Sequence, residues 1–148
     1  MNFQTDEEVR ECLAAITASD AIDSNTDIID MSGYTGATFI VPIADSVATG
    51  IATMTIEQST ANADGAMAAL SGATATATSA ANDDLNNTLL MITIDHPKER
   101  YIQAVLTSAI ANIAYGNTIV ILHGATHLPV SEHASIQAGT FVISPAEA

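Results

Sequence analysis

Residues 37–59 read ATFIVPIADSVATGIATMTIEQS, and the fold depends on the pattern in this stretch. In residues 37–44 and 51–59, apolar residues alternate with polar or small ones, and Ile, Val and Thr are frequent. A period of two with β-branched residues is typical of strands. We therefore predict two strands joined by a short connection. Pro42 has no N–H to donate to a ladder, so it indicates a sheet edge or a bulge.

Three later segments have the same character: LLMITID at residues 89–95, RYIQAVLT at 100–107 and NTIVILHG at 117–124. Turn residues bound each segment, and most of the connections between them are too short for a helix. This organisation predicts a mainly β protein with an antiparallel β-sandwich, either jelly-roll or immunoglobulin-like. Alternation in residues 100–107 directs three residues toward the core: Ile102, Ala104 and Leu106.

The N-terminal segment has a different pattern, which predicts a short helix over residues 5–18. Thr5 and Glu8 have the spacing of a capping box, in which each side chain accepts a hydrogen bond from a backbone N–H at the helix start. Three residues would form the apolar face, namely Val9, Leu13 and Ile16. The following segment is rich in Ser, Asp, Asn and Gly, as expected of a linker, and a first strand is predicted near residues 28–31.

The chain is therefore expected to have three parts: an N-terminal helix and linker arm over residues 1–26, a β-sandwich domain over 27–130, and a C-terminal arm or final strand over 131–148. An extended tail carrying the apolar group Phe141, Val142 and Ile143 is suited to fastening one subunit to another.

Two segments allow alternative interpretations. Residues 60–88 are almost entirely small or polar, and their alternating threonines fit either a polar edge strand or a flexible loop. Residues 109–114 fit one helical turn or the approach to a turn between strands.

The charge balance excludes one class of partner. The chain has 148 residues, with 17 Asp and Glu against three Lys and Arg, giving a net charge of −14. Nucleic-acid binding depends on Lys and Arg contacts to phosphates, so we expect no direct contact with DNA or RNA. We also expect no membrane association, because no apolar run approaches the ~20 residues that span a bilayer.

Cys12 is the only cysteine, so no internal disulfide can form, and a reducing compartment is expected. The acidic residues near the N-terminus are unlike the basic start of a signal peptide. A buried structural thiol is the favoured role for Cys12, because a nucleophile needs a neighbouring base that lowers its pKa.

Three histidines raise a metal hypothesis, because His123, His127 and His133 have spacings of four and six residues. On one helix, the first pair would share a face and could hold zinc. Here His123 ends a predicted strand and His127 follows a turn, so the spacing sets no common direction. We favour surface or interface histidines and expect no metal.

Two pairs of adjacent carboxylates, Glu7-Glu8 and Asp83-Asp84, resemble the acids of glycoside hydrolysis. Both lie in polar sequence, so solvated acids are favoured, and residues 82–87 lack the regular oxygens of an EF-hand loop. We therefore expect no catalytic residue and no cofactor, and hence no enzyme.

Two of the three basic residues, Lys98 and Arg100, lie in one predicted turn between strands. Arg100 is expected to bind an acid or a carbonyl at the start of its strand, with Lys98 solvated. The alternative is that both contact an acidic patch on a partner protein.

From Asp27 to Val130 the sequence resembles a group of small tailed-phage virion proteins, in which a Gly and an alternating strand, a Thr-rich strand ending in Gln-x-Ser, a variable loop, an Arg-Tyr strand and a last strand before Pro-Val follow in order. The matching segments here are Gly33 with residues 37–41, residues 53–59, Asp64-Gly65, residues 100–107, residues 119–124 and Pro129-Val130. Gln103 departs from the pattern, which has a second Arg at that place.

This resemblance implies a non-enzymatic capsid cement or decoration protein on the outer capsid surface of a bacteriophage virion, made in the host cytoplasm. It also implies the major capsid protein as partner, and a homo-oligomer, for which we expect a trimer. The interface residues predicted from the sequence are Lys98, Arg100, Phe141, Val142 and Ile143. A head-to-tail connector or tail component is the alternative, and a carbohydrate-binding sandwich is disfavoured because aromatic residues are few.

Overall fold

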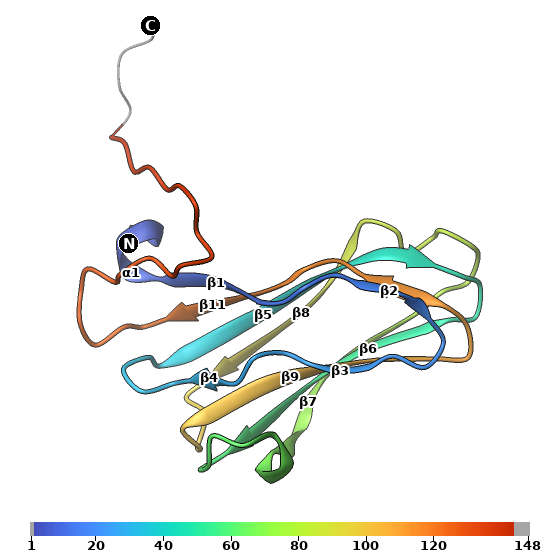
Figure 1. The fold of residues 1–148 in the computed structure, drawn as a ribbon, viewed down its shortest axis with the longest axis horizontal. Coiled ribbons are helices and arrows are strands. Elements are labelled where there is room, and N and C mark those ends of the chain that lie inside the picture. Colours follow the sequence, from blue (N-terminus) through green and yellow to red (C-terminus); the bar gives the residue numbers. More distant parts are fainter. Residues whose placement is uncertain (1, 144–148) are drawn as a thin grey trace, which may run out of the picture.

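The computed structural model describes residues 2–143, which form two short helical segments and eleven strands (Figure 1). In chain order the elements are α1 (Phe3–Asp6), β1 (Glu8–Leu13), β2 (Ile16–Ser19), β3 (Asp23–Asn25), β4 (Ile29–Asp30), β5 (Gly36–Ser46), β6 (Ile51–Ser59), the 3₁₀ turn η1 (Asp64–Ala66), β7 (Ala68–Thr78), β8 (Thr88–Asp95), β9 (Tyr101–Ala109), β10 (Ile113–Tyr115) and β11 (Thr118–His123).

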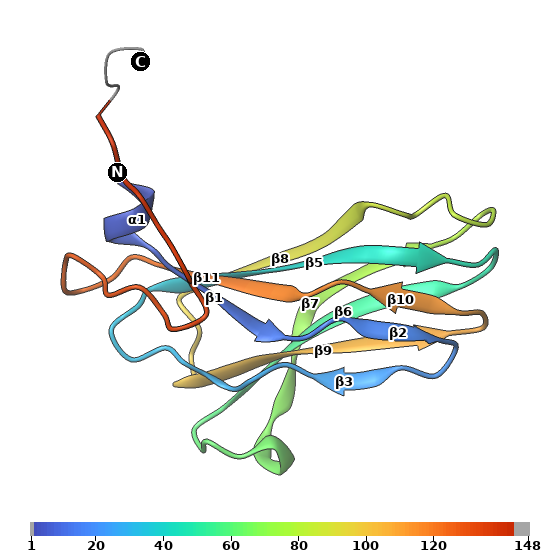
Figure 2. The same cartoon turned by 45° about the horizontal axis from the view of Figure 1, so that its top comes forward.

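The strands form two antiparallel sheets that face each other, as Figure 2 shows along their length. In the first sheet the order is β1-β11-β5-β10-β2, with β8 on the free side of β5. The second sheet has the order β3-β9-β6-β7, and β4 also pairs with β9. The predicted antiparallel β-sandwich is confirmed.

The strand order is that of a jelly roll rather than an immunoglobulin domain. Three pairs of strands are separated only by short breaks, so β1 with β2, β3 with β4, and β10 with β11 each act as one broken strand. Counted this way, the first strand pairs with the eighth, the second with the seventh, the third with the sixth and the fourth with the fifth. This nested pairing is a long hairpin rolled into two sheets, which defines the jelly roll.

The helix predicted over residues 5–18 is wrong in its extent, although a short N-terminal helix is present. The helix ends at Asp6, and its start is capped by Asn2, whose side chain accepts from the Gln4 N–H at 3.2 Å. The segment that follows pairs with β11, with Val9 opposite Ile121. Residues 8–25, which we expected in a helix and linker arm, therefore supply edge strands to both sheets. Ladder formation with β11 overrides the local helical pattern.

Pro42 lies where β5 changes partner strands. β11 pairs with β5 from Gly36 to Ile40, and β10 pairs with it from Ile43 to Ser46. Between these ladders the Gly116 N–H donates to the Pro42 carbonyl at 2.8 Å, and the β10 pairing shifts register. Since β5 has neighbours on both sides, the edge interpretation of Pro42 is wrong. The alternative, a bulge-type irregularity, is confirmed.

The core lies between the sheets and follows the predicted alternation. Ile102, Ala104 and Leu106 of β9 are all fully buried, as predicted. Phe39 of β5 and Tyr115 of β10 are the largest fully buried side chains. The Tyr115 hydroxyl crosses to the other sheet, where it accepts from the Thr53 N–H at 3.0 Å and donates to the Thr107 carbonyl at 2.7 Å.

The segments for which the sequence allowed alternative structures form strands and an arm. Residues 68–78 form the edge strand β7, so the polar-strand interpretation holds for this part of residues 60–88. Residues 113–115 form β10, and no helical turn occurs there. Residues 131–143 contain no strand and leave the sandwich as an extended arm beside α1 (Figure 1); residues 144–148 lie outside the described residues.

Ile110, at the tip between β9 and β10, has φ +72° and is 69% exposed. A β-branched residue is strained in the left-handed region, whereas Asn tolerates it. We expect Ile110→Asn to raise the free energy of unfolding by about 1 kcal/mol, measured by urea denaturation. The control is Val47→Asn, which makes a similar change at a neighbouring exposed position without a positive φ and should not stabilise. A decrease in stability for Ile110→Asn would contradict the prediction.

Candidate interaction surfaces

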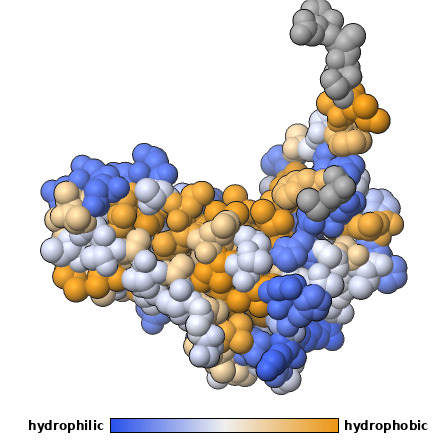
Figure 3. Space-filling model, turned by 180° about the vertical axis from the view of Figure 1, so that it is seen from behind, coloured by the Kyte–Doolittle hydropathy of each residue, from blue (hydrophilic) through white to orange (hydrophobic). Residues whose placement is uncertain are grey.

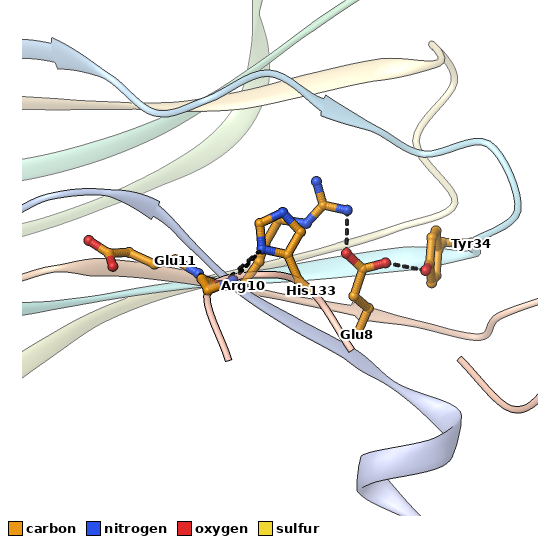
Figure 4. Close-up of polar contacts among 6 residues, drawn as sticks. Glu8, Arg10, Glu11, Tyr34 and His133 are labelled. Carbon is orange, nitrogen blue, oxygen red and sulfur yellow. Dashed lines mark hydrogen bonds and ion pairs between the residues drawn. The ribbon is translucent and has the colours of Figure 1, made fainter. Parts of the chain in front are cut away.

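A polar cluster joins β1 to the loop before β5. Glu8 is 8% exposed; one carboxylate oxygen accepts from the Arg10 guanidinium and the other from the Tyr34 hydroxyl. Figure 4 shows Glu8 between these two side chains. Burial, together with the Glu8 carboxylate, raises the pKa of Tyr34 to about 12. One oxygen of Glu8 thus pairs within β1, and the other holds this edge strand to the loop.

Removing one partner of Glu8 should be costly because its carboxylate is shielded from water. We expect Arg10→Met to lower the free energy of unfolding by about 1–2 kcal/mol, since an anion loses its charged donor. The double variant Glu8→Gln with Arg10→Met should lose less than the sum of the single changes. Urea denaturation of all four proteins gives a double-mutant cycle. If the loss of the double variant equals the sum of the two single losses, the pair has no coupling energy.

The base of the C-terminal arm is held against the same edge. The Val130 N–H donates to the Thr5 carbonyl at 2.7 Å, and the Ser135 hydroxyl accepts from the Glu11 N–H at 3.2 Å. The Gln4 side-chain amide also donates to the Glu132 carboxylate. A groove of about 520 Å³ lies between α1 and the arm, lined by Phe3, Val9, Ile136 and Phe141 among others.

The three histidines considered as metal ligands lie on different elements. His123 ends β11, His127 lies in the loop beyond it beside the Thr126 hydroxyl, and His133 lies in the arm, 3.0 Å from the Ser135 hydroxyl. Within residues 2–143, no group of three or more His, Cys, Asp or Glu side chains is placed to hold a metal ion. Cys12 is 2% exposed, and burial raises the pKa of its thiol to about 12. The predicted structural role for Cys12 fits this position.

The two carboxylate pairs have structural contacts. We expected a solvated acid at Glu8, but its carboxylate is buried and accepts from Arg10 and Tyr34. Desolvation by burial raises the pKa of its neighbour Glu7. Asp84 accepts from the Ser79 hydroxyl at 2.6 Å and from the Ala80 N–H at 2.7 Å, and these bonds lower its pKa and order the loop between β7 and β8.

Lys98 and Arg100 lie in and after the turn between β8 and β9, where both are exposed. Arg100 forms a two-pronged ion pair with Asp30 at 2.8 and 2.9 Å, and its guanidinium lies 5.2 Å from the centre of the Tyr101 ring. The predicted acidic partner at the strand start is therefore Asp30 of β4. Hydrogen bonding to Arg100 lowers the pKa of Asp30.

Gln103, which departs from the resemblance, is buried on the outer side of β9. Its amide donates to Asp64 at 2.8 Å and to Glu57 at 3.2 Å, and Asn25 donates to the same Asp64 oxygen at 2.6 Å. This network fixes η1 against β9, β6 and β3. A neutral donor between two carboxylates thus performs a structural role here.

Exposed apolar side chains gather at two places. Leu89 and Met91 of β8 are 61% and 60% exposed, and they pair across the ladder with Pro42 and Ile40 of β5. Seen from behind, hydrophobic residues gather in a band across the middle of the molecule, along the run of β8 (Figure 3). The second place is the arm end, residues 141–143, whose side chains are all more than half exposed.

The sequence identified the apolar arm but missed the β8 surface. The run LLMITID is apolar at successive positions, which indicates a strand buried on both faces as readily as one at an edge. Its edge position follows from the jelly-roll order, which local pattern does not encode. The signal that was available is the absence of charge from Thr88 to Ile94 in a strongly acidic chain.

The fold and these surfaces define a jelly-roll β-sandwich with an extended arm. No protein-family model and no curated protein matches the sequence. Among solved structures, the chain is similar to the PBSX exported protein XepA, with a TM-score of 0.48 and 16% identity over 97% of this chain and 45% of that one. It is also similar to a chain of the infectious bursal disease virus Gt strain, with a TM-score of 0.45 and 14% identity over 83% of this chain and 33% of that one. The protein thus spans less than half the length of both.

Neither helical segment among residues 2–143 has the length and apolar character needed to cross a membrane.

Proposed function

We propose that this protein is a non-enzymatic structural component of a tailed-phage particle, and specifically a cement or decoration protein that binds the outside of the capsid shell. The observation that carries the proposal is the exposed apolar surface on β8 and on the arm of an otherwise strongly acidic sandwich. Contiguous apolar surface outside a core marks a site of protein–protein contact. The sequence resemblance from Asp27 to Val130 implies that the partner is the major capsid protein.

The rest of the molecule supports a scaffold role. Glu8, Asp30 and Asp84 are held in ion pairs or hydrogen bonds that order strands and loops. A net charge of −14 suits a protein that coats a shell without binding the genome. Jelly rolls recur in viral capsid proteins and also in lectins, so the architecture is compatible with the proposal.

Copy number tests the proposal directly. Purified particles should contain this chain in numbers comparable to those of the major capsid protein, measured by gel densitometry or quantitative mass spectrometry. A single ring at one vertex would instead indicate the connector or tail role. Absence of the chain from the particles would contradict a virion role, and no binding on a glycan array would remove the carbohydrate-binding alternative.

The basic turn gives a test at the level of residues. If Lys98 and Arg100 contact the shell, Lys98→Ala and Arg100→Ala should each reduce occupancy on particles lacking the protein, measured by co-sedimentation. Asp30→Ala is the matched control, because it breaks the same ion pair but keeps the cation. It should leave occupancy unchanged. Equal loss of occupancy in Asp30→Ala and Arg100→Ala, with equal shifts in melting temperature, would assign Arg100 to stability alone.

A further inference from the structure

The two sheets have four edges, and three of them are protected against further strand pairing. The edge formed by β1 and β2 carries the charged residues Glu8, Arg10 and Glu11, and the arm covers part of it through Ser135. The edge formed by β3 and β4 consists of strands of three and two residues. Charge, coverage and shortness are the usual devices that blunt a sheet edge.

The β7 edge is protected by an irregularity. Thr55 pairs with Thr74, whereas Glu57 pairs with Ala69, so residues 70–73 bulge out of the ladder. Gly72 within this bulge has φ +81°. A bulge bends an edge strand away from a second chain that could add to it.

The β8 edge has neither the shortness nor the bulge that protects other edges. β8 pairs with β5 in unbroken register from Thr88–Ile43 to Asp95–Gly36, and no strand of residues 2–143 forms a ladder on its other side. From Thr88 to Ile94 it contains no charge, no proline and no glycine. β7 of the other sheet contacts β8 but forms no ladder with it. This edge presents free backbone donors and acceptors next to the exposed side chains of Leu89 and Met91.

The same chain contains a segment with the complementary property. Residues 139–143, GTFVI, are extended and form no ladder in the described chain, and the β-formers Phe141, Val142 and Ile143 are 57%, 61% and 85% exposed. The segment from Ala134 to Ile143 is uncharged, so it can approach another copy without adding to the repulsion between acidic subunits. Phe, Val and Ile have a strong preference for strands.

We propose that residues 139–143 of one copy add as a strand to the β8 edge of a second copy. The base of the arm is held on the β1 edge, which is opposite to β8 in the same sheet. The contact is therefore head-to-tail: each copy donates an arm at one edge and receives an arm at the other. Repetition of such a contact produces a closed ring or a filament. This inference concerns self-association and does not depend on the particle.

Self-association of the full chain tests the proposal first. Sedimentation velocity should show species larger than a monomer, and Met91→Lys in β8 or Val142→Asp in the arm should each weaken association about tenfold or more. Thr78→Lys is the matched control, because it places the same charge at an exposed position of the protected edge β7; it should leave association unchanged. Melting curves show whether each variant folds.

Cross-linking identifies the pair of surfaces. A copy carrying Val142→Cys is mixed with a mass-labelled copy carrying Met91→Cys, and oxidation should yield the mixed disulfide between the two copies. A monomer at all concentrations would overturn the proposal, and so would a predominant Met91→Cys homodimer, which indicates symmetric pairing of two β8 edges. A cross-link within a single doubly substituted chain, in place of the mixed product, would show that the arm folds back on its own sandwich. In each case, binding to particles remains separately measurable, so failure here leaves the proposed function standing.

Discussion

Replacing Phe39 with Ala is expected to lower the free energy of unfolding by about 3–5 kcal/mol. Phe39 is fully buried in β5, the strand that pairs with β8 on one side and with β10 and β11 on the other. Removal of the ring loses its transfer free energy and leaves a cavity that neighbouring strands cannot fill without breaking ladders. Urea denaturation monitored by circular dichroism measures the loss.

Phe3→Ala is the matched control for this prediction. This substitution removes the same ring from a position in α1 that is 51% exposed and lies outside the sandwich. Its loss should be less than about 1 kcal/mol, as expected for a largely solvated side chain. Similar losses for Phe3→Ala and Phe39→Ala would contradict the placement of the core.

Tyr115→Phe should cost about 1–3 kcal/mol, although it removes a single oxygen. The hydroxyl lies between the Thr53 N–H of β6 and the Thr107 carbonyl of β9, while the ring is anchored in β10. Without the hydroxyl, both backbone groups lose a partner inside the sandwich, where water cannot replace it. The same denaturation assay applies, and a loss below about 0.5 kcal/mol would show that these groups find other partners.

The pH dependence of this variant gives a second measurement. Burial raises the pKa of Tyr115 from 10.0 to about 12, so the folded state retains a proton that the unfolded state loses. The contribution of Tyr115 to the free energy of unfolding is therefore full below pH 10 and falls as the pH rises toward 12. Tyr115→Phe cannot titrate, so its deficit relative to the unsubstituted protein should shrink over this interval. A constant difference between the two proteins from pH 9 to pH 12 would contradict the raised pKa.

The central strands could be predicted from the sequence because their side-chain pattern and their environment agree. Residues 51–59 match β6 in full, and the core face of β9 is the predicted one. In these strands one face meets the opposite sheet, so an alternating sequence has one stable register. The edge strands were harder. Residues 8–13 resemble a helix locally, and only pairing with β11, distant in sequence, makes them a strand.

The candidate surfaces could likewise be predicted only in part. Arg100 was expected to find an acid, because a guanidinium at a strand end needs a partner, but its identification as Asp30 required the fold. Glu8 was expected in water, because neighbouring acids made its segment look polar. Its burial depends on Arg10, two residues along the same strand, and on Tyr34, which the loop before β5 brings to it. The local sequence pattern identifies which residues need partners, and the fold determines which partners they contact.

The nested order of the strands also sets how this chain reaches its native state. Because Glu8 pairs with Leu122, the outermost ladder cannot form until nearly all of the sandwich sequence is available. Folding dominated by such distant contacts is slow, on the order of milliseconds to seconds for β-sandwiches. A nascent chain on the ribosome would therefore hold β1 unpaired until β11 emerges, and hairpins such as β6 with β7 are the natural places for structure to begin.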